Sequence, residues 1–266
     1  MISVLIRTQD ERVFNCIHSI KNTFPTSKIV ISTVPDKTLT TQISALKIKF
    51  CVVPRKNGST TTNKGLELIK TIKVLITDSD TVFDKNCIKL LDNALDKYDV
   101  VKSHIVFRND GTLKSILVAN LRTYFNSKSS KMYTPGLGFK MSIKHKIGGY
   151  YFDDKVTWSE DSEFSNRVEK NLLKTYVEKR AKLFHPSVSL SHDLASAFLT
   201  GAKKLDTKTI LQIITNRIKT YREILEVFGT KTLLYGLVWY LFFDFGKLSK
   251  YFGKIGLGIQ DYFWKL

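Results

Sequence analysis

Two aspartates separated by one serine, Asp78 and Asp80, follow an apolar run in the stretch KVLITDSD. Carboxylates this close repel each other unless a cation lies between them. The pair stands out because the chain is basic, with 42 Lys and Arg, 24 Asp and Glu and a formal net charge of +18. The pattern fits a divalent-metal site, since Mg2+ and Mn2+ prefer oxygen ligands. It also fits two solvated side chains that cap the next helix.

A second acidic pair, Glu160 and Asp161, begins the stretch EDSEFSNRVEKN, which has the composition and spacing of a helix. Acidic side chains in a first helical turn interact favourably with the helix dipole, and Ser159 or Asp161 can serve as the N-cap. A carboxylate can also act as a general base where it lies within hydrogen-bond reach of the proton that it removes. The residues alone leave both roles open.

The elements that must position these acids are readable in the first hundred residues. Short β-branched runs predict strands, and segments with apolar residues three or four apart predict helices. The predicted strands are SVLIRT at 3–8, KIVISTVP at 28–35, KFCVVP at 49–54 and KVLIT at 73–77, and the predicted helices span 10–21, 40–46, 60–70 and 84–97. This alternation predicts βαβ units and a parallel sheet. Asp78 and Asp80 then lie just beyond the carboxyl end of a strand, where open α/β sheets bind ligands.

The pattern changes after residue 98. The segments DVVKSHIVF and LKSILVAN flank Asn109-Asp110-Gly111, which predicts a β-hairpin that extends the sheet with antiparallel strands. Residues 131–149 are rich in glycine and predict a loop.

Together these features resemble a GT-A glycosyltransferase, most similar to the inverting enzymes of glycosyltransferase family 2. The resemblance covers about residues 1–193, and its order and spacing are more specific than any one motif. It is carried by SVLIRT, Asp36 after the second predicted strand, NGSTTTNKGL, DSD, and GLGFKMSIKHKIGGY followed by WSED. It implies an α/β fold, the GT-A fold, whose Rossmann-like, mixed and mainly parallel sheet is flanked by helices. We assign residues 1–200 to this catalytic domain and residues 201–266 to a C-terminal amphipathic helical appendage.

The resemblance also implies an activity, that of a metal-dependent, inverting, hexosyltransferase-type enzyme. The donor would be a UDP- or GDP-linked sugar, and Mn2+ or Mg2+ would neutralise its diphosphate. Asp80 would bind the metal, with Asp78 at the metal or the ribose. Asp161 would be the general base, with Glu160 beside it. Histidines follow the catalytic region at 185 and 192, and we take His192 as the further metal ligand.

The remaining donor contacts follow from the same resemblance. Thr8, Asp36 and Asn63 would contact the nucleotide, and Trp158 would form an apolar wall for a sugar ring. The family often has arginine before the asparagine of the third motif, whereas this chain has Thr62 before Asn63. Arg55 or Lys64 could take the place of that arginine.

Two other functions compete with this one. The stretch VLITDSDTVFD also fits the first motif of haloacid-dehalogenase-type phosphatases, with Asp78 as nucleophile and Asp80 as acid–base. Three predicted β–α units precede it here, whereas that motif normally opens the catalytic core. A basic nucleic-acid-binding module would explain the charge, but no helix-turn-helix, zinc or RNA-recognition signature is present. We therefore expect no nucleic-acid partner.

The last 66 residues predict helices with apolar faces and lysine flanks. Residues 201–266 carry 11 Lys and Arg against 5 Asp and Glu. The run LLYGLVWYLFF has only 11 residues, and a membrane-spanning helix needs about 20. We expect an interfacial helix on an anionic membrane surface, with packing on the core or in an oligomer as the alternative. The acceptor would then be a lipid-linked or membrane-proximal glycan. Three cysteines without a C-x-x-C spacing favour a reducing compartment, which makes the expected location cytoplasmic and peripheral to the membrane.

Overall fold

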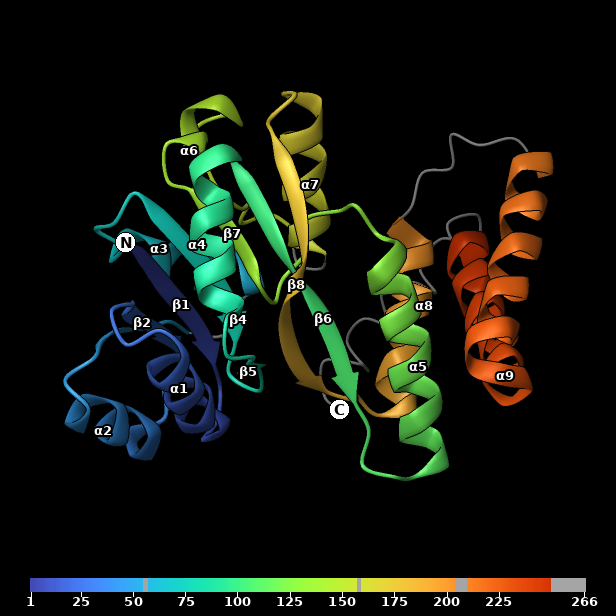
Figure 1. The fold of residues 1–266 in the computed structure, drawn as a ribbon, viewed down its shortest axis with the longest axis horizontal. Coiled ribbons are helices and arrows are strands. Elements are labelled where there is room, and N and C mark those ends of the chain that lie inside the picture. The colour runs from blue at the N-terminus through green and yellow to red at the C-terminus, as the bar shows by residue number, and fades with distance from the viewer. Residues whose placement is uncertain (55–56, 157–158, 204–209, 250–266) are drawn as a thin grey trace. The chain divides into compact units, whose positions relative to one another are not determined.

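A computed structural model describes residues 1–54, 57–156, 159–203 and 210–249 of the chain (Figure 1). The chain divides into two compact units. The first holds the sheet and comprises Met1–Val106 and Ser127–His185. The second is helical and comprises Phe107–Asn126 and the chain from Pro186 onward. The helical part thus begins before the boundary at residue 200 that the sequence suggested, and it includes a segment from the middle of the chain.

The first half of the sheet unit confirms the predicted β–α alternation. Its strands are β1 (Ile2–Thr8), β2 (Lys28–Thr33), β3 (Lys49–Val52) and β4 (Lys73–Asp78). Its helices are α1 (Arg12–Thr23), α2 (Lys37–Ala45), α3 (Gly58–Glu67) and α4 (Cys87–Lys97). β1 pairs in parallel with β2 and with β4, and β2 pairs in parallel with β3. The ends of β1 and β4 therefore lie side by side.

The second half of the sheet is antiparallel. It adds β5 (Val82–Phe83), β6 (Val100–Arg108), β7 (Leu137–Lys140) and β8 (Thr175–Pro186) to give the order β3-β2-β1-β4-β7-β6-β8-β5. β7 pairs with both β4 and β6, and β5 pairs with β8. The mixed α/β sheet flanked by helices is thus confirmed. The predicted loop at 131–149 was partly wrong, because it contains β7 and the short helix α6 (Ile143–Lys146).

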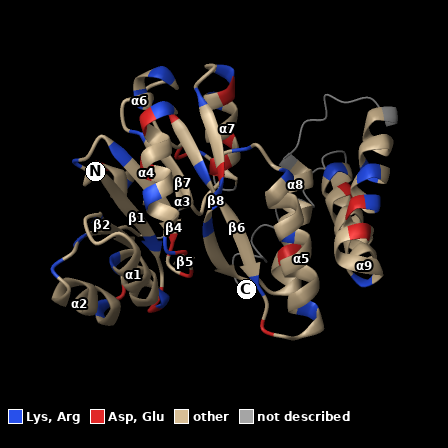
Figure 2. Cartoon of the chain, viewed as in Figure 1, with Lys and Arg blue, Asp and Glu red and all other residues tan. Residues whose placement is uncertain are grey.

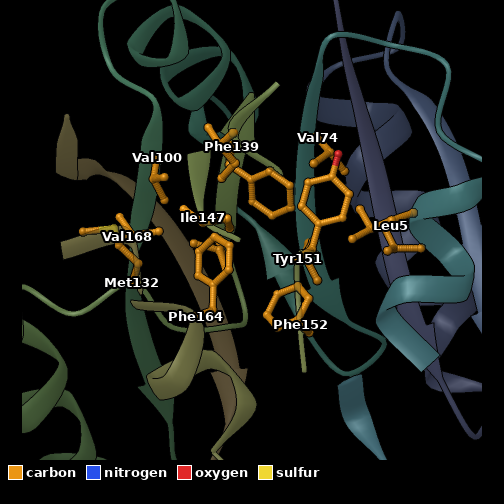
Figure 3. Packing of buried hydrophobic residues seen from close by; sticks show 14 of the residues in the cluster. Leu5, Val74, Val100, Met132, Phe139, Ile147, Tyr151, Phe152, Phe164 and Val168 are labelled. Atoms are coloured by element: carbon orange, nitrogen blue, oxygen red, sulfur yellow. The ribbon is translucent and has the colours of Figure 1, made fainter. Parts of the chain in front are cut away.

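Side chains from both halves of the sheet share one core (Figure 3). Phe139 of β7 packs against Phe164 of α7 (Glu160–Lys170), and Phe164 stacks on Phe152. Gly138 lets β7 approach its neighbours, since a Cβ there would crowd Val101. This aromatic core fixes the first turn of α7, and with it Glu160 and Asp161, against the centre of the sheet.

The predicted hairpin around Asn109-Asp110-Gly111 is wrong. The segment after the turn is the helix α5 (Leu113–Lys128), and Thr112 accepts a hydrogen bond from the Ser115 N–H at its start (3.3 Å). The turn therefore caps a helix, and the short ILV run that suggested a strand belongs to a longer pattern with helical spacing.

The helical unit consists of α5, α8 (Leu190–Lys203) and α9 (Ile210–Ser249). α9 contains the apolar run LLYGLVWYLFF and bends at Gly229, whose φ of 78° and ψ of 178° are not helical. Gly201 of α8 and Gly246 of α9 bring the two backbones together, because a Cβ on either would overlap a carbonyl of the other helix. Asp193, almost fully buried, accepts hydrogen bonds from Arg122 Nε and Tyr235 OH, both at 2.6 Å.

One stretch of the described chain, Gln212–Ser249, is long and apolar enough to cross a membrane by length and composition alone, because a window of 18 residues within it has a mean hydropathy of 1.2. The expectation that the apolar run is too short rested on residues 233–243, which are only part of this helix. The predicted terminal segment beyond Ser249 lies outside the described residues.

Candidate functional site

Strand register brings the first acidic motif against an arginine. The parallel pairing of β1 and β4 sets Arg7 directly beside Asp78, and Arg7 Nε donates to Asp78 Oδ1 at 2.8 Å. The chain then turns, because Thr81 donates its hydroxyl to the Asp78 carbonyl (2.8 Å). The next helix, α4, begins only at Cys87. Asp78 and Asp80 therefore do not cap a helix.

Arg7 is the hub of the site, because its guanidinium joins both acidic motifs. Besides Asp78, it contacts Glu160 (Nη1 to Oε1, 3.1 Å), Thr134 (3.0 Å) and Thr62 (3.3 Å). Burial lowers the pKa of Arg7, but the charges of Asp78 and Glu160 outweigh it and hold the pKa above its ordinary value. The side chain is only 14% exposed, so these ion pairs are shielded from solvent. Arg7 therefore keeps its charge and neutralises the two carboxylates.

Asp161, the predicted base, lies half-buried beside this hub. Its Oδ2 accepts from the Thr134 N–H at 3.3 Å and from the Thr134 hydroxyl at 3.4 Å. Burial and the adjacent Glu160 raise the pKa of Asp161 to about 7, against the opposing charge of Arg7. A carboxyl group that titrates near neutrality can accept a proton in one step and release it in another. Asp161 is thus suited to general-base chemistry.

Asp80 occupies a different environment from Asp78. Its Oδ2 lies 3.3 Å from Arg12 Nη1, and its Oδ1 lies 3.4 Å from His185 Nε2. Burial raises the pKa of Asp80, as does the charge of Asp78, whereas His185 and Arg12 lower it. Among the described residues, Asp80 Oδ1 has no hydrogen-bond partner although it is buried. This oxygen is therefore available to a ligand.

The turn after β1 holds Arg12 in place. Thr8 is buried, and its hydroxyl donates to the Asp10 carbonyl (2.8 Å) and accepts from the Asp10 N–H (3.2 Å). The Asp10 carboxylate in turn binds Arg12 through Nε and Nη2. Thr8 therefore shapes the turn that brings Arg12 to Asp80. Its predicted contact with a nucleotide stays a prediction.

Asn63 anchors the loop that precedes α7. Its amide donates to the Phe152 carbonyl (2.7 Å) and to Asp154 (3.1 Å), and its oxygen accepts from the Phe152 N–H (3.2 Å). Both hydrogens and the oxygen of the amide are thus used within the protein. The structure shows Asn63 in a positioning role, and a direct donor contact stays a prediction.

The other predicted residues have individual outcomes. Asp36 caps α2 by accepting from the Leu39 N–H (2.8 Å), which leaves its second oxygen for any contact with a base. Trp158 and Arg55 lie outside the described residues. His192 belongs to α8 of the helical unit, where its N–H donates to Ser189 Oγ (3.2 Å), and its role as a metal ligand stays a prediction. The histidine that the structure brings beside Asp80 is His185.

A divalent ion fits only part of this site. Within the described ranges, no three His, Cys, Asp or Glu side chains converge closely enough to hold a metal by themselves. The available Asp80 Oδ1 and the neighbouring His185 are donors that Mn2+ accepts, and Asp78 is held by Arg7. Mg2+ is often bound through one or two carboxylates together with substrate phosphates. The residues therefore fit a cation whose remaining ligands come from a substrate.

Two basic residues of this site do not follow from the sequence motifs. Arg7 is the penultimate residue of SVLIRT, and a cation there, on a strand next to the DSD strand, was an available signal. His185 takes the place beside Asp80 that the sequence suggested for His192.

Comparison with known proteins identifies the fold. No family model matches the chain, and neither does any curated protein. Solved structures do match, among them Staphylococcus aureus TarS residues 1–349, with a TM-score of 0.54, 16% identity and coverage of 95% of this chain and 92% of that one. The same protein in complex with UDP matches at TM-score 0.52 and 17% identity, with coverage of 95% and 92%. The complex with UDP-GlcNAc matches at 0.53 and 18% identity, with coverage of 93% and 72%.

These likenesses show the fold, and the chain has the GT-A fold that its motif order predicted. Against the longer TarS structure, this chain spans about half the length, 55%. The GT-A fold also accounts for the three β–α units that precede the DSD motif, which the phosphatase interpretation did not.

Proposed function

We propose that the protein is an inverting glycosyltransferase that moves a sugar from a nucleoside diphosphate to a hydroxyl group of an acceptor. The proposal rests chiefly on one arrangement, in which a half-buried Asp161 with a pKa near 7 lies beside Glu160 and Arg7, and Arg7 also binds Asp78 of the strand-end D-x-D. The GT-A fold supports it, as do the UDP and UDP-GlcNAc complexes of the similar S. aureus TarS. A UDP-linked hexose is the donor that these neighbours favour.

The donor diphosphate belongs at the ends of β1 and β4. Asp80 and His185 would hold a Mn2+ or Mg2+ ion there, which, when bound, neutralises charge on the leaving diphosphate. Arg7 keeps the Asp78 carboxylate in a fixed position through two contacts of 2.7 and 2.8 Å. Arg12 lies on the solvent side of Asp80 and adds a second fixed cation.

Asp161 would supply the base. It takes the proton of the acceptor hydroxyl while that oxygen forms a bond to the anomeric carbon and the bond to the diphosphate oxygen breaks. The electron pair of the broken bond leaves with the diphosphate, and attack from the opposite face inverts the anomeric centre. Arg7 binds Glu160, so Glu160 takes no part in this proton transfer and Asp161 alone accepts the proton.

Donor binding and proton removal can be tested separately. UDP-GlcNAc, UDP-glucose and GDP-mannose with Mn2+ should be screened by thermal shift on wild type, Asp80→Asn and Asp161→Asn. We expect a UDP-sugar to stabilise wild type and Asp161→Asn alike and to stabilise Asp80→Asn less. Turnover by Asp161→Asn should fall about a hundred- to ten-thousandfold. Failure of every nucleotide to shift melting would overturn the proposal, and phosphomonoester hydrolysis lost only in Asp78→Asn would favour a phosphatase.

We further propose that the enzyme works at the cytoplasmic face of a membrane on a lipid-linked or membrane-proximal glycan. On α9, apolar side chains recur at the surface every three or four residues: Leu234, Val238, Leu241, Phe245 and Leu248. The first part of α9 carries Arg217, Lys219 and Arg222. Figure 2 shows where the Lys and Arg residues lie along the chain, in blue, and both units carry them. Anionic headgroups would attract these cations at about 1 kcal/mol each, and the apolar stripe would enter the interface.

Vesicle sedimentation tests this location. The full chain should pellet with phosphatidylglycerol vesicles, less so at high salt, and weakly with phosphatidylcholine. Leu241→Glu should release it, whereas Leu172→Glu, an exposed leucine of the sheet unit, should not. A lipid-independent oligomer that Leu241→Glu disrupts would show instead that the stripe joins two copies of the chain.

A further inference from the structure

A buried lysine in the middle of the sheet unit makes no hydrogen bond to any residue that the structure describes. Lys102 lies on β6 and is fully buried, and among the described residues its Nζ has no hydrogen-bond partner. Its ammonium lies 5.1 Å from the centre of the Tyr133 ring. Lys73, which is also buried, is by contrast paired with two aspartate side chains at 3.0 and 2.7 Å. Buried cations without a partner are costly, so Lys102 calls for an explanation other than stability.

The surroundings of Lys102 place it beside the candidate base. Burial lowers the pKa of Lys102 to about 8, and the carboxylate whose charge opposes this effect is Asp161. The hydroxyl of the adjacent Ser103 is also buried without a partner among the described residues. Lys102 forms no ion pair within the described part of the chain, so this buried ammonium near Asp161 is arranged to receive an anion from a substrate.

Two further lysines act on the same part of the sheet unit as Lys102. His104 lies two residues further on β6, so it projects from the same face of that strand. Burial lowers the pKa of His104, and the charges of Lys182, Lys102 and Lys179 add to the effect, so the imidazole is held neutral. Lys179 and Lys182 are exposed on β8. The three lysines give this region a positive field, and such fields attract anionic ligands.

We propose that Lys102 binds an oxyanion, a phosphate or carboxylate group, of the acceptor substrate. This inference rests on the proposed function, because it assigns the chemistry of the acceptor at the same site. The charges of Asp78 and Asp80 act on Arg12 at the ends of β1 and β4, whereas the charge that acts on Lys102 is that of Asp161. Lys102 lies over the ring of Tyr133, and the next residue, Thr134, donates to Asp161, so the lysine is close to the base, where the acceptor hydroxyl must lie.

The test uses small probes, because the acceptor is unidentified. Glycerol 3-phosphate, glycerate and glycerol are titrated by calorimetry into the full chain saturated with UDP and Mn2+. The two anions carry a hydroxyl with an oxyanion, and glycerol lacks the charge. The variants are Lys102→Met, which keeps the length of the side chain, and Lys73→Met, a matched buried lysine outside the site. Melting of the unliganded variants is measured in parallel.

We expect at least one anionic probe to bind wild type and Lys73→Met, glycerol to bind neither, and Lys102→Met to lose about ten- to hundredfold in affinity for the anion. Unliganded Lys102→Met should melt at or above the wild-type temperature, since a buried unpaired charge is gone, whereas Lys73→Met should melt lower.

Three results would overturn the inference: equal anion binding by Lys102→Met, no anion binding by wild type, or weakened UDP binding by Lys102→Met. The last would assign Lys102 to the donor. A chain that binds the anionic probe through Lys102 but no nucleotide would refute the proposed function and leave the anion site standing.

Discussion

Asp161→Asn should stabilise the protein, and increasingly so as the pH rises. In the folded chain burial and Glu160 raise the pKa of Asp161 from 3.8 to about 7. Between these values the folded state binds a proton that the unfolded state has lost, so stability falls as the pH increases. Asparagine does not titrate, and its carbonyl can still accept the two long hydrogen bonds from Thr134, at 3.3 and 3.4 Å. The Asp161→Asn variant therefore does not lose this stability as the pH rises.

The size of the effect follows from the shift. At 1.36 kcal/mol per pH unit, a rise from 3.8 to about 7 corresponds to about 4 kcal/mol at pH 8. Movement of Glu160 away from Asp161 and entry of water reduce this value, so that we expect about 2–4 kcal/mol. Such a change raises the melting temperature by about 5–10 °C in a domain of this size. At pH 4 the difference between wild type and variant should vanish.

Urea unfolding of both proteins from pH 4 to 8 measures this difference directly. Asp78→Asn is the matched control, because Asp78 is paired with Arg7 at 2.7 Å and its replacement should destabilise the fold at neutral pH. Two Asp→Asn changes in one site should thus act in opposite directions. A constant difference between Asp161→Asn and wild type across the pH range would refute the raised pKa and, with it, the electrostatic basis for choosing Asp161 as base.

Three further substitutions probe the supports of the site and of the helical unit. Gly58→Ala would push Glu160 away from Arg7, because a Cβ at residue 58 would overlap the Glu160 carboxylate. Kinetics should show turnover about ten- to hundredfold lower, and melting should show a free energy of unfolding within about 1 kcal/mol of wild type. Gly246→Ala should lower the free energy of unfolding in urea by about 1–3 kcal/mol, since its Cβ would overlap the α8 backbone. Gly236→Ala in the same helix should raise it by about 0.5–1 kcal/mol, because the nearest atoms to its Cβ would be 3.6 Å away. Arg167→Met should free the backbone carbonyls that this arginine binds at 147, 150 and 151, which hydrogen exchange of that loop would report as faster exchange.

The β–α half of the fold was predictable because its signals are local. Each strand there is a short β-branched run, and each helix repeats apolar residues every three or four positions. The run 116–118 within α5 is ambiguous by the same criteria, because three apolar residues do not fix a period. Only the longer pattern through Tyr124 and its packing in the helical unit decides for a helix.

The acidic residues of the site were predictable from the sequence, whereas its basic residues were not. Asp78, Asp80 and Asp161 follow from motifs of two or three adjacent residues. The partners of Arg7 lie 71 and 153 residues away, and strand register brings Asp78 to it while the packing of α7 brings Glu160. His185 and Lys102 are likewise single residues whose roles depend on neighbours in space. A site with several carboxylates needs cations between them. Sequence spacing does not show which basic residues take that place.

These cations also decide how a metal should behave. In the protein alone, Asp78 is neutralised by Arg7 and Asp80 is paired with Arg12, so the carboxylates do not need a metal to coexist. The fixed cations disfavour a free divalent ion at this place, and the described residues offer too few ligands to hold one.

A bound diphosphate makes binding of the divalent ion favourable, because it adds negative charge and oxygen ligands together. Mn2+ alone and UDP alone should therefore shift the melting temperature little, and the two together should shift it more than the sum of their separate effects. Arg12→Gln removes the cation beside Asp80 and replaces no carboxylate residue. This variant should bind Mn2+ alone more tightly than wild type does. An equal shift by Mn2+ with and without UDP would show instead that the protein holds a complete metal site of its own.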